Sequence, residues 1–168
     1  MIQAYNTIEL FKKACRVVEP PPNQSISEWA EKNRVLSRES SAEAGKYRVS
    51  RAPYQEEIQN AIGSSQTECV VIMSSAQIGK TEIINNGIGH SIDIDPCPIL
   101  VVMPTEALAK TWSKKRLSPM LRDTPALRGR VAEAKSRDGE NTILEKSFPG
   151  GYIAMVGANS PVGLASRS

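Results

Sequence analysis

Residues 69–81 read CVVIMSSAQIGKT. The first five are apolar throughout, which is typical of a strand buried on both faces, as in a parallel sheet. The loop-like stretch 74–81 comes next, and the helix-like run EIINNGIGHSIDI follows it. This order predicts a buried strand over 69–73, a tight loop and then a helix.

Two further apolar runs resemble the first. They read ILVVM over 99–103 and YIAMV over 152–156. A helix capped by Thr105 and reaching Leu117 is predicted between them, and 142–148 alternates loosely as a strand would. We therefore predict the α/β class, with helices flanking a mostly parallel sheet. The runs at 69–73, 99–103 and 152–156 are expected to be adjacent parallel strands.

The N-terminal half predicts helices separated by a loop. Apolar spacing indicates a helix over 5–18, which three prolines end at 20–22. Ser25 or Ser27 is suited to cap a short helix through Trp29. The polar run 37–46 reads as a loop.

Pro53 suits the start of another helix, over YQEEIQNAI. Tyr54, Ile58 and the pair Ala61/Ile62 fall on one side of that helix, so this side is expected to face the core.

Composition is that of an ordinary globular protein. The 168 residues are 40% hydrophobic and 23% charged, and one domain is the expectation. No apolar run approaches the roughly 20 residues of a membrane span, and the N-terminus has no pattern of a secretory signal. Cys15, Cys69 and Cys97 lack metal-ligand spacing, so we expect buried, reduced thiols. His90 is expected to be structural.

Positive charge is concentrated in one stretch. Nine basic and two acidic residues lie from Lys110 to Arg137, a balance of +7, although the whole chain carries only +3. Such a stretch on a mildly acidic remainder favours a surface for a polyanion. A solvated helix face is the alternative.

The loop at 74–81 has the pattern of a phosphate-binding loop. In such loops a buried strand leads to backbone N–H groups that surround phosphates, and a Lys and a hydroxyl open the following helix. Lys80 stands where the β- and γ-phosphates would be bound, and Thr81 where Mg²⁺ would be. The remaining loop residues expected at the nucleotide are Ser74, Ser75, Ala76, Gln77, Ile78 and Gly79.

Ser74 stands where such loops begin with Gly, whose backbone freedom a small Ser only partly replaces. An ordinary strand–turn–helix corner is therefore the alternative. Upstream, Tyr54 could stack on a base, and Gln55 could bond the N6 and N7 edge of adenine. Tyr54 fits a core face equally well.

The ordered set of motifs resembles a known family. SSAQIGKTE, then VVMPTEALAKTWSKKRLSPMLRDTPALRGRV, then VGANSPVGLASRS are similar to the large terminase subunit of tailed bacteriophages, in the branch typified by phage lambda. The resemblance covers roughly 25–168. It implies the first part of a P-loop ATPase domain related in fold to helicases, with 1–24 as an arm that docks the small terminase subunit.

The resemblance also implies a function. In that family ATP hydrolysis with Mg²⁺ drives double-stranded DNA into proheads in the host cytoplasm, and a separate endonuclease domain cuts the DNA. The implied partners are DNA, the small subunit, the portal protein and other copies in a ring. We expect the DNA contacts to come from Lys110, Lys114, Lys115 and Arg116.

The sequence departs from the family in two respects. No apolar run ends in the Asp-Glu pair that would hold Mg²⁺ and activate water, so the fragment alone is expected to be nearly inactive. The loop also lacks the Arg found in other terminase branches. Arg167 is the alternative source of a catalytic, charge-stabilising guanidinium, and Lys80 is the other expected catalytic residue. Arg167 also fits a solvated position near the chain end.

Two other functions remain open at this point. A P-loop fold that lacks the acidic pair would suit a non-catalytic module that binds DNA or protein. A helicase-like ATPase would share the fold, but helicase motifs are not present in the sequence.

Overall fold

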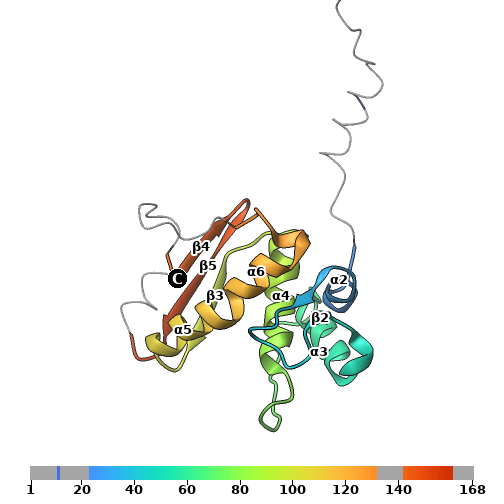
Figure 1. Ribbon diagram of the computed structural model, residues 1–168, viewed down its shortest axis with the longest axis horizontal. Coiled ribbons are helices and arrows are strands. Elements are labelled where there is room, and N and C mark those ends of the chain that lie inside the picture. The colour runs from blue at the N-terminus through green and yellow to red at the C-terminus, as the bar shows by residue number, and fades with distance from the viewer. Residues whose placement is uncertain (1–10, 12–22, 132–141, 161–168) are drawn as a thin grey trace, which may run out of the picture.

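The computed structural model describes residues 11, 23–131 and 142–160, and the structural statements below concern these residues (Figure 1). Apart from Phe11, the helix predicted over 5–18 lies outside them, and so does Cys15. Arg167 and the basic residues Lys135 and Arg137 also lie outside the described residues.

The first described helix, α2 (Ile26–Asn33), begins at a capping box. The Ser25 hydroxyl accepts from the Glu28 N–H at 3.3 Å, and the Glu28 carboxylate accepts from the Ser25 N–H at 2.9 Å. Of the two predicted caps, Ser25 is the one that forms, and the helix runs past Trp29. Two short strands follow, β1 (Val35–Leu36) and β2 (Gly45–Lys46), paired antiparallel across the polar loop.

Helix α3 (Tyr54–Ile62) follows a 3-10 turn at Val49–Arg51, and its predicted bounds are confirmed. The prediction of its buried side is wrong. The buried residues are Gln55 and Gln59, while Tyr54 is 54% exposed and Ile62 39%. Polar side chains occupy the inner side because their amides are hydrogen-bonded there, which offsets the cost of burial.

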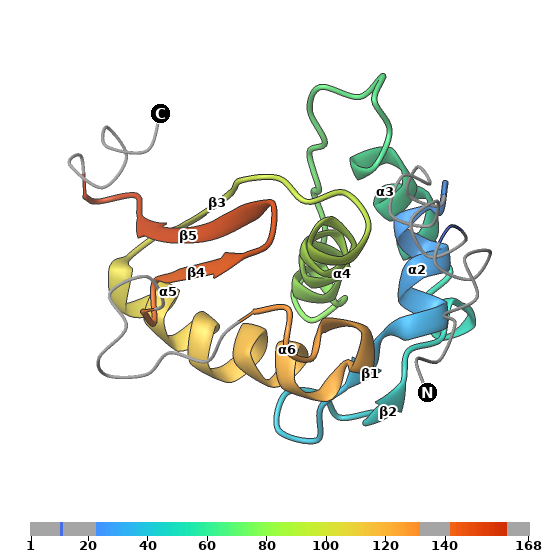
Figure 2. The same cartoon turned by 90° about the horizontal axis from the view of Figure 1, so that it is seen from above.

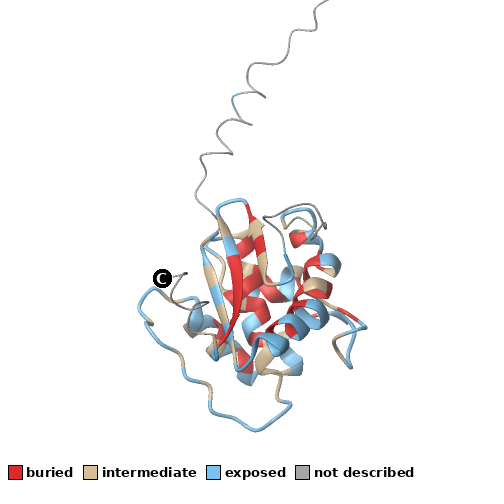
Figure 3. Ribbon diagram, turned by 90° about the vertical axis from the view of Figure 1, so that its left-hand side faces the viewer, coloured by how far each residue is buried: buried red, intermediate tan, exposed pale blue. Residues whose placement is uncertain are grey.

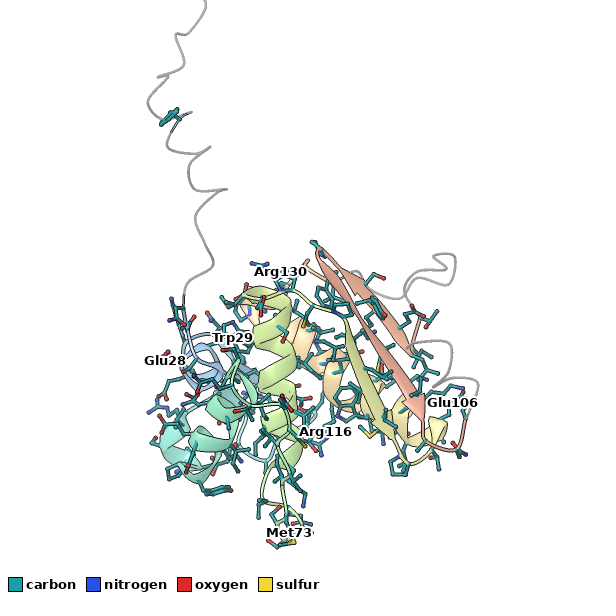
Figure 4. All side chains as sticks on the ribbon, turned by 180° about the vertical axis from the view of Figure 1, so that it is seen from behind. Glu28, Trp29, Met73, Glu106, Arg116 and Arg130 are labelled. Carbon is teal, nitrogen blue, oxygen red and sulfur yellow. The ribbon has the colours of Figure 1, made fainter. Side chains whose placement is uncertain are left out.

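The strand predicted over 69–73 is not formed. Within the described residues this segment is neither strand nor helix, and Val71 and Met73 are 85% and 96% exposed. Figure 4 shows Met73 at the tip of a loop that projects from the body. An apolar sequence favours a strand, but a strand also needs a neighbour to complete its hydrogen bonds. No described strand pairs with this segment.

The central sheet has three strands in the order β3-β5-β4. β3 (Ile99–Met103) and β5 (Gly151–Gly157) are parallel, with Ile99 opposite Ile153. The hairpin strand β4 (Glu145–Phe148) is antiparallel to β5. The α/β class and the parallel pairing of 99–103 with 152–156 are confirmed. The sheet is mixed, and 69–73 is not part of it.

A continuous helical rod covers one face of the sheet. It consists of α5 (Glu106–Trp112), one π-helical turn η2 (Ser113–Leu117) and α6 (Ser118–Asp123), followed by the 3-10 turn η3 (Pro125–Leu127). Thr105 caps it as predicted, accepting from the Leu108 N–H at 3.2 Å. One hydrophobic core includes residues of α2 and α4 (Lys80–Asp93) together with buried residues of the rod and the sheet: Ala109, Trp112, Leu117, Met120, Ile153 and Met155. Figure 3 shows the buried parts of the ribbon in red.

Helix α4 (Lys80–Asp93) lies between this sheet layer and the pair α2 and α3 (Figure 2). The Trp29 indole packs against Gly89, where an added Cβ would collide with its ring, and donates to Asp93 at 2.8 Å. His90 lies edge-on to Trp29, and its Nε2 is 2.8 Å from the Gln24 carbonyl oxygen. These contacts agree with a structural role for His90.

The cysteine prediction needs a correction. Cys69 is exposed and Cys97 half-buried, both as free thiols, because the segment containing Cys69 lies in the projecting loop instead of a buried strand. No helix in the described part of the chain is long and apolar enough to span a membrane.

Candidate functional site

The loop between 74 and 79 turns through two left-handed residues before α4 begins. Gln77 has a φ of 63° and Gly79 a φ of 82°. Gly79 is the N-cap of α4, and a Cβ at this position would lie 2.5 Å from Nε2 of Gln55. Glycine is therefore required at 79 for two reasons, its backbone conformation and the close approach of a neighbouring side chain.

Lys80 folds back over the loop that precedes it. Its ammonium donates to the Ser75 carbonyl at 2.8 Å and to the Ser74 carbonyl at 3.3 Å. An ammonium has three donors, so one remains for a ligand. Ser74 contacts Lys80 through its backbone carbonyl. Its hydroxyl is not part of this contact and lies at the long distance of 3.5 Å from the Ser75 carbonyl oxygen.

The first turn of α4 combines the features of an anion site. The free N–H groups and the positive end of the helix dipole favour a phosphate there, and Lys80 adds a charge. Thr81 lies in the same turn. Glu82 is not directed to a ligand, because it is paired at 2.8 Å with Arg34. Burial lowers the pKa of Arg34, and the charge of Glu82 opposes this effect.

A cavity of about 690 Å³ adjoins the loop. Its lining includes Gln77, Ile78 and Gly79 of the loop, Tyr54 of α3, and several residues of the segment 36–48. Its volume is within the usual range for small-molecule sites. Two further lining residues are paired with each other: Arg51 donates to Glu43 through two nitrogens, at 2.6 and 2.9 Å.

Tyr54 and Gln55 both contact the loop itself. The Tyr54 hydroxyl donates to the Ile78 carbonyl at 3.0 Å, and Nε2 of Gln55 donates to the same oxygen at 2.9 Å. The other polar atom of Gln55 accepts from the Tyr47 hydroxyl at 3.2 Å. Their assignment as adenine contacts stays a prediction, and the structure brings both residues to the predicted phosphate loop.

The basic residues predicted to contact DNA lie along the exposed side of the rod formed by α5, η2 and α6. Lys110 is paired with Glu106 at 2.6 Å. Arg116 donates to the Ser40 carbonyl. Among the described residues, no hydrogen bond or ion pair is found for Lys114 or Lys115.

The rod also contacts the loop at 37–44, which contributes to the wall of the cavity. Arg122 donates to Glu39 at 3.0 Å and to Asp123 at 2.7 Å. These bonds raise the pKa of Arg122, and the Arg122 bond is the main reason why the pKa of Asp123 is lowered. The basic rod is thus connected to the cavity through this loop.

Sequence reasoning missed several residues that surround the site. Tyr47, Gln59 and Asn86 form a buried hydrogen-bonded group behind Gln55, and Arg34 holds Glu82. One signal could have found part of this group. Gln55 and Gln59 are four residues apart, so a helix places both amides on one face.

Comparison with known proteins identifies a related family. A family model described as "Phage terminase large subunit gpA, ATPase domain" matches residues 41–168. The large terminase subunit of Escherichia phage lambda is 28% identical over 147 residues, covering 87% of this chain and 23% of that protein. The large subunit of Enterobacteria phage P21 is 27% identical over 135 residues, covering 80% and 21%.

The chain thus spans less than a quarter of the length of these two relatives. No solved structure is significantly similar to it. The family match includes the whole loop at 74–81, the three-stranded sheet and the basic rod, and it covers well over half of the residues. The chain therefore belongs to the family of phage terminase large subunits, and its residues 41–168 match the ATPase domain of that family.

Proposed function

We propose that this chain is the nucleotide-binding part of a terminase large subunit. In the whole subunit, ATP hydrolysis would drive double-stranded DNA into a phage prohead. The observation that best supports the proposal is the loop at 74–80. There a left-handed Gly79 opens α4, and Lys80 lies over the loop with a donor to spare.

Each part of the loop would have a separate role. Lys80 would bind the β- and γ-phosphates, and the backbone N–H groups from Ser75 to Gly79 would surround them. The adjoining cavity would receive the nucleoside, with the exposed ring of Tyr54 against the base.

Mg²⁺ would be held by the Thr81 hydroxyl together with phosphate oxygens and water. The donor set fits this ion, because Mg²⁺ usually retains waters and takes few protein ligands. Within the described residues, no group of three His, Cys, Asp or Glu side chains is placed to hold a metal. When bound, the ion would neutralise charge on the phosphate oxygens.

The groups that activate water would come from elsewhere in the subunit. We infer this because the sequence contains no apolar strand ending in an acidic pair. The 168-residue chain alone would then bind ATP weakly and hydrolyse it very slowly. Arg167 remains the proposed charge-stabilising guanidinium.

The exposed side of the rod would face DNA. Lys114 and Lys115 are the best candidates, because neither has a partner within the described residues, whereas Lys110 and Arg116 do. The remaining proposed partners are the small terminase subunit, the portal protein and further copies in a ring, acting in the host cytoplasm beside a separate endonuclease domain.

The proposal is tested with Lys80→Ala in the full-length subunit. Charge-assisted hydrogen bonds contribute about 1.5–3 kcal/mol, so ATP affinity should fall by about tenfold to a hundredfold. DNA packaging should be lost. Lys32→Ala, on the exposed side of α2, is the matched control and should change neither. Wild-type ATP affinity and packaging in the Lys80→Ala subunit would contradict the proposal.

A further inference from the structure

Two side chains from α3 converge on one carbonyl of the loop. Nε2 of Gln55 and the hydroxyl of Tyr54 donate to the Ile78 oxygen at 2.9 and 3.0 Å. A carbonyl has two lone pairs, so it can accept both bonds. Both polar groups come from consecutive residues at the start of α3, and they fix the direction in which this carbonyl points.

The direction of the carbonyl determines that of the next N–H. The peptide bond is planar and trans, so the Gly79 N–H points away from the Ile78 oxygen. With that oxygen held against α3, the Gly79 N–H is directed to the other side of the loop. We propose that Gln55 and Tyr54 are positioning residues, which orient the Ile78–Gly79 peptide so that its N–H binds the phosphates of the nucleotide.

This inference rests on the proposed function, and a second feature supports it. A buried chain of hydrogen bonds stands behind Gln55. Asn86 on α4 donates to Gln59 at 3.1 Å, Gln59 donates to the Tyr47 hydroxyl at 2.9 Å, and Tyr47 donates to Gln55 at 3.2 Å. Gln55 then donates to Ile78.

The donors and acceptors in this series of hydrogen bonds can be assigned in only one direction. The Ile78 carbonyl can only accept, so Gln55 must turn its NH₂ toward the loop and its oxygen toward the Tyr47 hydroxyl. The same reasoning orients each following group back to Asn86. The four side chains are 0–5% exposed. Burial raises the pKa of Tyr47, which keeps its hydroxyl protonated and able to donate. Bonds arranged head to tail reinforce one another.

In this arrangement the effect of Gln55 on binding does not depend on which base the nucleotide carries. A residue that reads adenine affects ATP more than GTP, and it has no effect on a ligand without a base. A residue that orients a backbone N–H toward phosphate affects all such ligands equally. The probes are therefore ATP, GTP and inorganic tripolyphosphate, each measured by equilibrium binding to the full-length subunit.

Gln55→Glu is the main variant, because it keeps the shape of the side chain and replaces the donor with a carboxylate oxygen. Affinity for all three probes should fall by the same factor, about tenfold. Glu57→Gln, the reverse isosteric change at an exposed position of the same helix, is the control and should leave all three affinities unchanged.

Tyr54→Phe provides a second test that does not disturb the buried chain. It removes the hydroxyl bond to Ile78 but keeps the exposed ring. Affinity for tripolyphosphate should fall about threefold, and affinity for ATP by the same factor. Because the ring is retained, any stacking on the base is unaffected.

Two results would overturn the inference. The first is that Gln55→Glu weakens ATP binding and leaves GTP and tripolyphosphate at wild-type affinity, which would make Gln55 an adenine reader. The second is that Gln55→Glu and Tyr54→Phe leave tripolyphosphate binding unchanged while Lys80→Ala abolishes it. If Lys80→Ala itself leaves that binding unchanged, the proposed function fails, and this inference fails with it.

Discussion

The guanidinium of Arg34 lies 2.8 Å from the carboxylate of Glu82, the residue that follows Thr81, and the Arg34 side chain is 2% exposed. The pair joins the end of α2 to the first turn of α4, where Lys80 lies. A second nitrogen of Arg34 donates to the Val35 carbonyl at 2.5 Å. The ion pair between the buried Arg34 and Glu82 therefore holds the start of α4 against α2.

Breaking this pair should destabilise the protein. Glu82→Gln leaves Arg34 buried beside a neutral amide, and loss of one partner of a buried pair typically costs 3–5 kcal/mol. Because the Glu82 side chain is 19% exposed, we expect a loss of about 2–3 kcal/mol in the free energy of unfolding, measured with denaturant. Glu43→Gln breaks the exposed pair with Arg51 and should cost much less, because exposed ion pairs contribute little to stability. Equal losses in the two variants would contradict the argument.

The sequence predicted those elements whose structure depends on local pattern. The strand at 99–103, the helix at 54–62 and the caps at Ser25 and Thr105 follow from apolar runs, proline and hydroxyl side chains near their own helices. The segment 69–73 did not follow its pattern. Whether an apolar run forms a strand depends on a pairing partner, and a partner is a property of the tertiary structure.

The candidate site shows the same division. The position of Lys80 at the start of α4 could be predicted from Gly79 and the spacing around it. The spacing of Gln55 and Gln59 puts both amides on one face of α3, but their burial could not be predicted, because hydropathy assigns an amide to the exposed side of a helix. Tyr47, more than ten residues away from Gln59 in the sequence, supplies the bond that makes burial of that amide acceptable.

Lowering the pH should remove the contribution that the Asp123 carboxylate makes to the free energy of unfolding. Its pKa is lowered, chiefly by the hydrogen bond from Arg122, so the folded state binds this proton less readily than the unfolded chain does. The ordinary Asp pKa is about 3.9. The stabilising contribution is therefore complete above that range and is lost as the pH falls through the lower, folded-state pKa.

The measurement is NMR titration of the Asp123 carboxyl carbon. Arg122→Gln should raise its pKa toward the ordinary value. Arg130→Gln removes a different arginine, one paired with Asp93 at 2.6 Å, and should leave the Asp123 pKa unchanged. Identical titration curves for Asp123 in wild type and Arg122→Gln would exclude Arg122 as the cause.

The basic rod should bind duplex DNA with strong salt dependence. Each phosphate contact changes the slope of log affinity against log salt by about 0.9. The double variant Lys114→Ala/Lys115→Ala in the full-length subunit should therefore reduce the slope by up to about 2. Lys110→Ala should reduce it less, because Lys110 is already paired with Glu106.

Lys32→Ala on α2 removes the same charge outside the rod and is the control for net charge. If this variant and the double variant have the same slope as wild type, DNA does not contact this part of the rod.

Gly79→Ala should impair both the fold of the loop and ligand binding. The left-handed backbone makes any side chain unfavourable by about 1 kcal/mol or more, and the new methyl would lie 2.5 Å from Nε2 of Gln55. Gly129→Ala is a matched control, since Gly129 has a φ of 75° and no atom within 4 Å of an added Cβ. The left-handed backbone should lower the free energy of unfolding in both variants. Only Gly79→Ala should weaken tripolyphosphate binding. Equal binding by the two variants would contradict the contact argument.

Ser74 provides the last prediction, because it is the position at which the loop departs from the common pattern. The structure assigns its carbonyl, not its hydroxyl, to the contact with Lys80. Ser74→Gly keeps that carbonyl and adds backbone freedom, so ATP affinity and packaging by the full-length subunit should remain close to wild type.

Ser74→Ile should be damaging, because a β-branched side chain restricts the backbone and stiffens the turn that directs the carbonyl to the ammonium. ATP affinity measured for both variants separates the two roles. If Ser74→Gly lowers affinity as much as Ser74→Ile does, then the hydroxyl itself takes part in binding. The altered first position would in that case be a chemical feature of the site and not a tolerated change of shape.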